Sequence, residues 1–400
     1  MMKSMLSAVE SSQRVAKWRM WLLVGSHLVD DLYQGAVPAM VPFFVAERHY
    51  GYVAAAGITL AATLLSSVVQ PLFGILTDRR PMPWLVPAGL SVAGIGIGLS
   101  GLADSYLWTW LAIALSGLGV AAYHPESARL ARAAAAGSHV GMSWFSLGGN
   151  VGFALGPILV APVMATMGLG GSPLLMIPAL IVGLLMSLLM RRLTPAAGAM
   201  VASGRAGMVD RWSQFSRLTI VVIMRSVAMF SLHTFLALWV TDRLDADGHL
   251  AGQAALVLLF GAGAVGTLLG GMMAGRWGRV RLIRWSYLLT IPMLAGVALI
   301  PGPAVFVFIV GTGLCLNIPF SLTVTLAQDY LPSRIGTASG VTLGLAMSIG
   351  GLAAPLVGLL AEAISLQVAL LSLLVAPVVS WLTALRLEEP VQLIAKSTQL

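Results

Sequence analysis

The sequence predicts an all-α membrane protein, with twelve transmembrane helices arranged as two pseudo-symmetric six-helix bundles. Three observations predict this fold class. Of the 400 residues, 58% are apolar and 10% are charged, whereas about 25% of the residues of a soluble domain are charged. Apolar stretches long enough to cross a bilayer recur along the chain, and the two halves repeat each other's motifs. The sequence shows no ten-residue alternation of the kind typical of a transmembrane β-barrel.

A spanning helix requires about 20 consecutive, mostly apolar residues, and glycine, proline or charged residues separate the stretches that qualify. The first half of the chain contains six, at 18–45, 52–76, 84–102, 106–128, 140–168 and 172–190. The second half contains six more, at 217–241, 252–275, 281–301, 303–327, 337–361 and 366–386.

Polar segments set the expected domain organisation. The longest, 191–216, predicts a cytoplasmic linker between an N-terminal bundle, 18–190, and a C-terminal bundle, 217–387. Residues 1–17 and 388–400 are expected to be a cytoplasmic N-terminus and a cytoplasmic tail.

Basic residues predict the orientation of the chain. With both termini in the cytoplasm, about 20 of the 23 Lys and Arg residues lie in cytoplasmic segments, and the outer loops contain only Arg48 and Arg243. Membrane topology therefore explains the net charge of +8, and the clustered basic and aromatic pattern of a nucleic-acid-binding protein is missing. We expect a multi-pass monomer in the inner membrane of a bacterium.

Two pairs of segments repeat at a constant spacing. TLLSSVVQPLFGILTDRR has a counterpart in GAVGTLLGGMMAGRWGRVR, and SWFSLGGNVGFALGP, which ends at Pro157, has one in VTLGLAMSIGGLAAP, which ends at Pro355. Parallel repeats of six spans, each contributing half of a central site, are a common transporter architecture.

The segment SHLVDDLYQG, 26–35, places ionisable side chains inside the first span. His27 and Asp31 are four residues apart and share a helix face with Gln34, whereas Asp30 shares that face only in part. At 1.5 Å per residue, His27 lies about 12 Å deep and Asp31 about 18 Å deep. An acid at the centre of a membrane helix costs about 2.5–3.5 kcal/mol on insertion scales, which indicates a functional role.

Arg225 lies about 12 Å deep in the seventh span, the counterpart of the first, and His233 follows two turns later. Two interpretations remain open, a structural Asp–Arg tie and a transport site. One arginine can balance only one of two acids, so the other carboxylate is left for proton coupling. Arg225 would hold an anionic substrate group, or the acid when no substrate is bound, and His27 would tune Asp31 or relay its proton.

The segment YHPESAR ends the fourth span. Glu126, Arg129 and Arg132 follow one another at intervals of three residues and share a helix face. They form either an interfacial salt-bridge patch or, with His124, a proton exit or substrate contact on the inner vestibule. His124 and Glu126 do not face each other, and the single Cys315 excludes a cysteine cluster, so no metal site is expected.

A stripe of small residues in the fifth span, Gly148, Gly149, Gly152 and Gly156, lets two helix backbones approach closely. Pro157 then removes one helix hydrogen bond and bends the helix. The stripe has either a packing role alone or a role in shaping the outer gate.

Several motifs resemble those of known transporters. Gly74-Ile75-Leu76-Thr77-Asp78-Arg79-Arg80 resembles the loop 2–3 signature of the major facilitator superfamily, although Pro81-Met82-Pro83 replaces the usual continuation. GNVGFALGP resembles a motif of the antiporters in this superfamily. A closer resemblance, to the fosmidomycin-resistance branch of drug efflux proteins, is carried by HLVDD, QPLFGILTDRRPMPW and YHPESARLAR. The resemblance implies the superfamily's fold, proton-driven export, and a latch in which Asp78 and Arg79 meet the N-terminus of span eleven.

We therefore expect a transporter and not an enzyme, which exports small molecules or drugs, such as fosmidomycin-like phosphonates, by alternating access. A proton gradient takes the place of a cofactor, because the chain has no phosphate-binding loop for ATP. The alternatives are a proton-coupled importer or uniporter of a metabolite, a membrane sensor or scaffold, and an enzyme acting within the membrane.

The candidate residues fall into three groups. Proton coupling is assigned to Asp31, Asp30 and His27. Substrate binding is assigned to Arg225, His233, Gln34, Tyr33, Glu126, His124, Asn150 and Asn317, and aromatic lining also to Phe43, Trp144, Phe145, Phe230 and Trp239. Gating is assigned to Asp78, Arg79, Gly74, Gly152, Gly156 and Pro157.

Overall fold

The structure is a computed structural model, which describes residues 2–102, 104–135, 139–193, 209–244, 250–332, 338, 341–342 and 346–390. Every regular element in these ranges is a helix. The first half contains α1 (Met2–Arg48), α2 (Tyr52–Arg79), α3 (Leu85–Ser100), α4 (Tyr106–Ala135), α5 (His139–Met167), the short 3₁₀ helix η1 (Gly168–Met176) and α6 (Ile177–Leu193). The second half contains α7 (Trp212–Leu244), α8 (Leu250–Trp277), α9 (Arg279–Leu299), η2 (Gly302–Ala304), α10 (Val305–Asn317), α11 (Pro319–Tyr330), α13 (Ala346–Ala363), α14 (Leu366–Ser372) and α15 (Val375–Ala384).

These helices follow the ranges expected from hydropathy, with differences in both halves. In the first half, α1 begins at Met2 instead of at residue 18, and η1 stands where the expected ranges 140–168 and 172–190 meet. The range 303–327 is divided into α10 and α11, because Pro319 has no N–H with which to continue the helix. The range 366–386 is divided into α14 and α15. Eight described stretches are long and apolar enough to cross a membrane, and two shorter apolar helices accompany them. Much of 337–346 lies outside the described residues, so the count of twelve stays a prediction.

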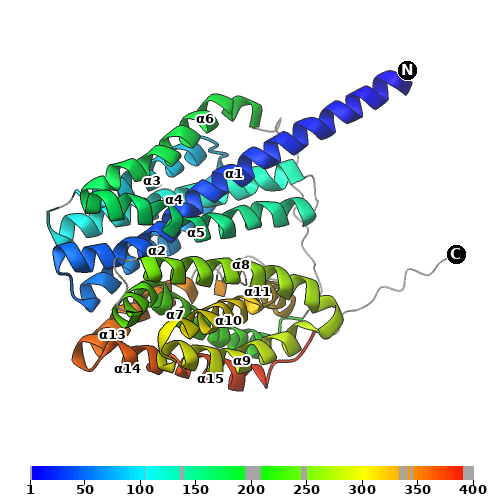
Figure 1. The fold of residues 1–400 in the computed structure, drawn as a ribbon. Helices are drawn as coiled ribbons and strands as arrows, with labels where there is room; N and C mark the ends of the chain where they lie inside the picture. The colour runs from blue at the N-terminus through cyan, green and yellow to red at the C-terminus, as the bar shows by residue number, and fades with distance from the viewer. Residues whose placement is uncertain are drawn as a thin grey trace.

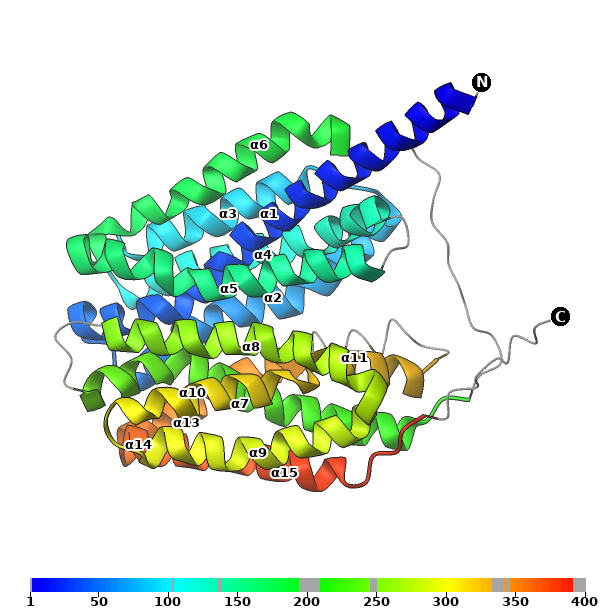
Figure 2. The ribbon, with the colours of Figure 1, turned by 45° about the vertical axis from the view of Figure 1, so that its right-hand side comes forward.

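The helices form two bundles, α1–α6 and α7–α15, which lie against each other along their length (Figure 1). We call the end at which α1 begins and α15 ends the terminal end, and the opposite end the far end. The ribbons of α5 and α8 lie closer together at the far end than at the terminal end (Figure 2).

Side-chain hydrogen bonds between the described parts of the two bundles lie at the far end. Gln253 at the start of α8 donates to the carbonyl of Ala39 on α1 at 2.8 Å, and the side chain of Gln253 is buried. Glu362 at the end of α13 accepts from the backbone N–H of Val53 at the start of α2, at 2.9 Å. The described structure is therefore a conformation in which the far end is closed.

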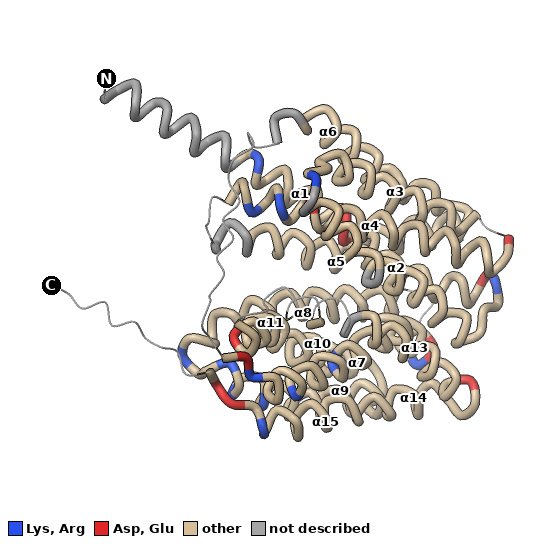
Figure 3. Tube along the Cα trace, turned by 180° about the vertical axis from the view of Figure 1, so that it is seen from behind, with Lys and Arg blue, Asp and Glu red and all other residues tan. Residues whose placement is uncertain are grey.

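Outer faces of the helices expose large apolar side chains. On α6, Ile181, Leu184 and Leu188 are 61–72% exposed, as expected of a face that contacts lipid. Lys and Arg gather at the terminal end, and acidic residues lie at both ends and inside the first bundle (Figure 3). Arg48 and Arg243 at the far end donate to the backbone carbonyls of Gly101 and Ala298.

Candidate functional site

The acidic segment of α1 lies in the interior of the first bundle. His27 Nε2 is 3.3 Å from Asp31 Oδ2, as their spacing of four residues predicts. Both residues are buried, and Asp30 is completely buried. Leu23, Tyr33 and Phe44 of the same helix belong to the hydrophobic core, so the acids lie on a part of α1 that is buried in that core.

His124 on α4 completes the cluster by contacting both acids. Its Nε2 atom is 3.3 Å from Asp31 Oδ1, and its Nδ1 atom is 3.3 Å from Asp30 Oδ2. Spacing along the chain gives no indication of this contact, because about 95 residues separate His124 from the acids. His124 therefore belongs with the acids and not with Glu126, whose carboxylate forms two hydrogen bonds with Arg129.

The backbone determines which ring nitrogens face the carboxylate. His27 Nδ1 donates to the carbonyl of Phe145 at 2.8 Å, and His124 Nδ1 donates to the carbonyl of Val120 at 3.0 Å. A carbonyl can only accept, so each Nδ1 carries a hydrogen. The two Nε2 atoms lie 3.4 Å apart, and each can donate to Asp31 only if its ring holds a second proton. The number of protons in the cluster therefore decides which hydrogen bonds it forms.

Asp30 and Asp31 have different surroundings. Asp31 also accepts a hydrogen bond from Gln34 Nε2 at 2.6 Å, and its side chain is 13% exposed. The Asp30 side chain is 0% exposed, and its oxygens have no hydrogen-bond partner with good geometry. A buried carboxylate without hydrogen bonds is costly in its charged form, so His124 provides the only compensating group that Asp30 contacts among the described residues.

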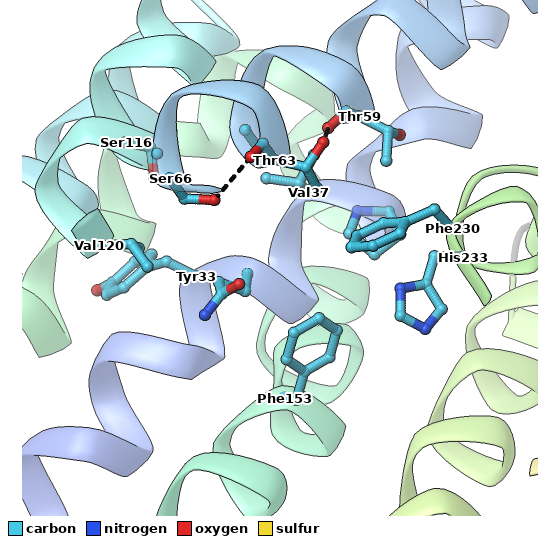
Figure 4. Close-up of a pocket in the computed structure, with 14 residues that line it drawn as sticks. Tyr33, Val37, Thr59, Thr63, Ser66, Ser116, Val120, Phe153, Phe230 and His233 are labelled. Carbon is cyan, nitrogen blue, oxygen red and sulfur yellow. Dashed lines mark hydrogen bonds between the residues drawn. The ribbon is translucent and has the colours of Figure 1, made fainter. Parts of the chain in front are cut away.

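A pocket of about 430 Å³ of empty space lies beside Gln34, between the two bundles (Figure 4). Phe153 of α5 and His233 and Phe230 of α7 lie on its lower and right side, and Thr59 and Thr63 of α2 on its upper side. The complete lining consists of Tyr33, Gln34, Val37, Pro38, Thr59, Ala62, Thr63, Ser66, Ser116, Gly117, Val120, Phe153, Phe230 and His233. Because Gln34 bonds Asp31 and also lines the pocket, it connects the acidic cluster with the pocket.

Three side chains of the cluster, two histidines and one aspartate, are of types that commonly bind metal ions. His27, Asp31 and His124 offer ligand atoms within 4.8 Å of one another, and each imidazole donates its other N–H to a carbonyl, as in many metal sites. The sequence predicts no metal here, and that prediction stays untested. Two imidazoles around one carboxylate are equally suited to holding protons.

Arg225 does not meet either acid in the described conformation. Its Nε donates to the carbonyl of Leu316, and its Nη2 donates to Asn317 Oδ1, both at 2.7 Å. The guanidinium also lies 4.8 Å from the centre of the Phe320 ring. Arg225 and the acids of α1 lie at similar depths in their bundles, but this similarity did not predict a contact between them. Acceptors at the break between α10 and α11 lie nearer to Arg225, within its own bundle.

The other substrate candidates are divided between the pocket and the packing of the bundles. His233 lies among Phe153, Phe230 and Phe260. Tyr33 lines the pocket, but its hydroxyl bonds the carbonyl of Leu175 and the N–H of Ala179.

Five further candidates do not line the pocket. Phe145 stacks on His27, and Trp239 donates to the carbonyl of Val297. Trp144 is 45% exposed against Trp21, so it faces outward. Asn150 on α5 is half-buried, and Phe43 is buried.

The glycine stripe of α5 packs against α1. A Cβ atom at Gly152 would lie 2.0 Å from the carbonyl oxygen of Leu28, and one at Gly156 would lie 2.4 Å from the carbonyl carbon of Gly35. At Gly149 a Cβ would meet Asp31 Oδ2 at 2.3 Å. The stripe therefore permits close packing, and Gly149 also leaves space for the acidic cluster.

The structure tests the proposed gating residues only in part. The side chains of Asp78 and Arg79, and Thr337 at the expected start of span eleven, lie outside the described residues, so the latch stays a prediction. A Cβ atom added at Gly74 would meet no atom within 4 Å. The helix α5 continues past Pro157.

Comparisons with known proteins agree with the motifs in the sequence. The family model described as Major Facilitator Superfamily matches residues 22–355. The chain is 32% identical over 338 residues to the fosmidomycin resistance protein of Escherichia coli (strain K12). It is 30% identical over 345 residues to the uncharacterized MFS-type transporter YfnC of Bacillus subtilis (strain 168). Each match covers 82% of both chains.

Solved structures share the fold. A bacterial homologue of the human lysosomal transporter Spinster, in an inward-facing and unoccupied conformation, superposes with a TM-score of 0.78 at 14% identity, covering 93% of this chain and 98% of that chain. The nucleoside transporter NupG superposes with a TM-score of 0.70, also at 14% identity, covering 92% of this chain and 98% of that chain.

Proposed function

This chain belongs to the major facilitator superfamily, and we propose that it is a proton-coupled transporter that exports small molecules or drugs. It is a membrane-spanning transporter and not an enzyme. The name of the E. coli relative supports substrates like fosmidomycin, including anionic phosphonates. The transported molecule moves by alternating access, with the proton gradient as its energy source.

The observation that carries this proposal is the contact of Asp31 with two histidines beside the pocket. Asp31 meets His27 and His124 at 3.3 Å, and Gln34 links it to the pocket lining. A proton that arrives at or leaves this cluster changes its hydrogen bonds and its charge. A neutral cluster costs less in a low-dielectric cavity, so the protonated carrier can change conformation.

Basic residues at the terminal end support a cytoplasmic location for both termini, in the inner membrane of a bacterium. The conformation with a closed far end is then open toward the cytoplasm. Protons enter from outside, reach Asp31 when the far end opens, and leave to the cytoplasm when the terminal end opens. The chain works as a monomer.

Direction and energy source can be measured together in inverted membrane vesicles that contain the protein. Fosmidomycin should accumulate inside the vesicles when their interior is acidified, and the accumulation should collapse when a protonophore removes the gradient. Matched vesicles without the protein provide the control. Uptake that requires the opposite gradient would favour an importer of a metabolite, the second candidate, and uptake that is unaffected by any proton gradient would favour a uniporter.

A further inference from the structure

Arg225 is a buried cation that has no acidic partner within the described parts of the chain. Its relative exposure is 8%, and its hydrogen bonds to Leu316 O and Asn317 Oδ1 use two of the five N–H groups of a guanidinium. None of the ion pairs found among the described residues includes Arg225. The interior of the second bundle therefore has a positive charge that its own described side chains do not neutralise.

The neighbours of Arg225 hold its side chain in place but are themselves uncharged. Asn317 is oriented by its own bond to the carbonyl of Gly313 at 2.9 Å, and the Phe320 ring covers the guanidinium. Buried charges are normally paired with an opposite charge, because the loss of water around an uncompensated charge is costly. Asp31 already has His27, His124 and Gln34 as partners. A guanidinium fixed in one orientation and lacking a counter-ion has the properties of an anion-binding group.

Tyr287 on α9 supplies a second, independent indication. Its side chain is fully buried, and its hydroxyl finds no hydrogen-bond partner among the residues that the structure describes, although buried hydroxyls are normally paired.

The register of α7 and α9 places Tyr287 close to the level of Arg225 in the second bundle. Trp239 on α7 donates to the carbonyl of Val297 on α9 at 2.9 Å, and both helices begin at the terminal end. Ten residues before this contact on each helix stand Met229 and Tyr287, so Arg225 lies one turn away from the level of Tyr287.

We propose that Arg225 and Tyr287 form an oxyanion site in the second bundle, which binds a phosphonate or phosphate group. The free N–H groups of the guanidinium provide the two parallel donors that match two oxygens of such a group. The tyrosine hydroxyl donates to a third oxygen and so obtains the partner that it lacks. This inference deepens the proposed function, because it identifies the chemical group by which an anionic substrate is held.

Binding can be measured by titration calorimetry on the purified protein in phosphate-free buffer, without any proton gradient. Methylphosphonate and inorganic phosphate serve as probes for a substrate group and for the free ion, and chloride serves as a simple anion. Methylphosphonate should bind to the wild-type protein. Tyr287→Phe, which keeps the ring, should weaken this binding about tenfold or more, as expected for the loss of a hydrogen bond to a charged group. Arg225→Lys should bind more weakly than wild type, because an ammonium lacks the planar fork, and Arg225→Gln should not bind.

Two substitutions in the same bundle provide matched controls. Tyr330→Phe removes a buried hydroxyl that already has a partner, the carbonyl of Glu388. Arg243→Gln removes an arginine that lies over Trp239 and donates to backbone carbonyls. Both variants should bind methylphosphonate like the wild type.

Equal binding by wild type and Arg225→Gln would overturn the proposal, and so would undiminished binding by Tyr287→Phe. Chloride binding as tightly as methylphosphonate would also overturn it, because a single halide cannot use two parallel donors. Tighter binding of methylphosphonate than of phosphate would identify the substrate's group as the occupant, and the reverse order would identify the free ion. A failed transport assay with intact methylphosphonate binding would reject the proposed export and leave the oxyanion site standing.

Discussion

His124 is the residue on which the contacts of both buried acids depend. Its ring nitrogens are 3.3 Å from Asp30 and from Asp31, whereas His27 contacts only Asp31 of the two acids. We therefore predict that His124→Gln lowers proton-driven transport at least tenfold, and that His27→Gln has the smaller effect. Both rates can be measured in vesicles with a fixed pH gradient.

His233→Gln is the control for a buried histidine outside the acidic cluster. It should change substrate affinity more than dependence on the gradient, because His233 lines the pocket and not the cluster. Equal loss of coupling in all three variants would mean that His124 has no special position.

Individual residues also show where sequence reasoning reaches its limit. Local spacing predicted the His27–Asp31 contact and the Glu126–Arg129 pair, since both depend on helix geometry alone. It could not predict that His124 joins the acids, because that contact depends on how α4 packs against α1. Arg225 was expected to balance an acid because of its depth, but depth does not specify which neighbours a side chain meets.

At the scale of helices, the close approach of α1 and α5 determines the shape of the acidic cluster. Gly152→Ala would place a Cβ 2.0 Å from the Leu28 carbonyl oxygen. We predict that this substitution destabilises the protein by about 1–3 kcal/mol, the usual cost of overpacking, measured as a lower melting temperature in detergent. Gly74→Ala is the control, because its Cβ would meet no atom within 4 Å. An unchanged melting temperature for Gly152→Ala would show that the two helices separate easily.

Hydropathy predicted the positions of the helices well, because a membrane requires long apolar segments with internally bonded backbones. It did not predict the interruption at Pro319, although proline signals such a break, and this interruption leaves the carbonyl of Leu316 beside Arg225. Hydropathy also gives no information on η1, whose glycines and proline continue an apolar stretch.

For the molecule as a whole, the far-end contacts should control the balance between the two conformations. Gln253 bonds across the two bundles, whereas Gln367 forms a similar bond, to Ala298 O, within one bundle. We predict that Gln253→Leu opens the far end several-fold more often, because a buried hydrogen bond contributes about 1 kcal/mol, and that Gln367→Leu does not.

The readout is the labelling of a single cysteine at Thr59, which lines the pocket, in a Cys315→Ser background. An impermeant reagent is added at the side of the membrane that faces the far end. Equal labelling in both glutamine variants would show that the cross-bundle bond does not hold this end closed.

The central claim is that Asp31 exchanges protons for substrate. The most direct measurement is substrate-triggered proton release from proteoliposomes that contain the wild type, Asp31→Asn or Asp30→Asn. Asp31 is the acid that is partly exposed and linked to the pocket, so Asp31→Asn should still bind substrate but release no protons and fail to export against a gradient. Asp30→Asn, at a completely buried position, should reduce proton release and export less. If Asp31→Asn still releases protons with substrate at the wild-type ratio, Asp31 is not the coupling residue and the account is contradicted.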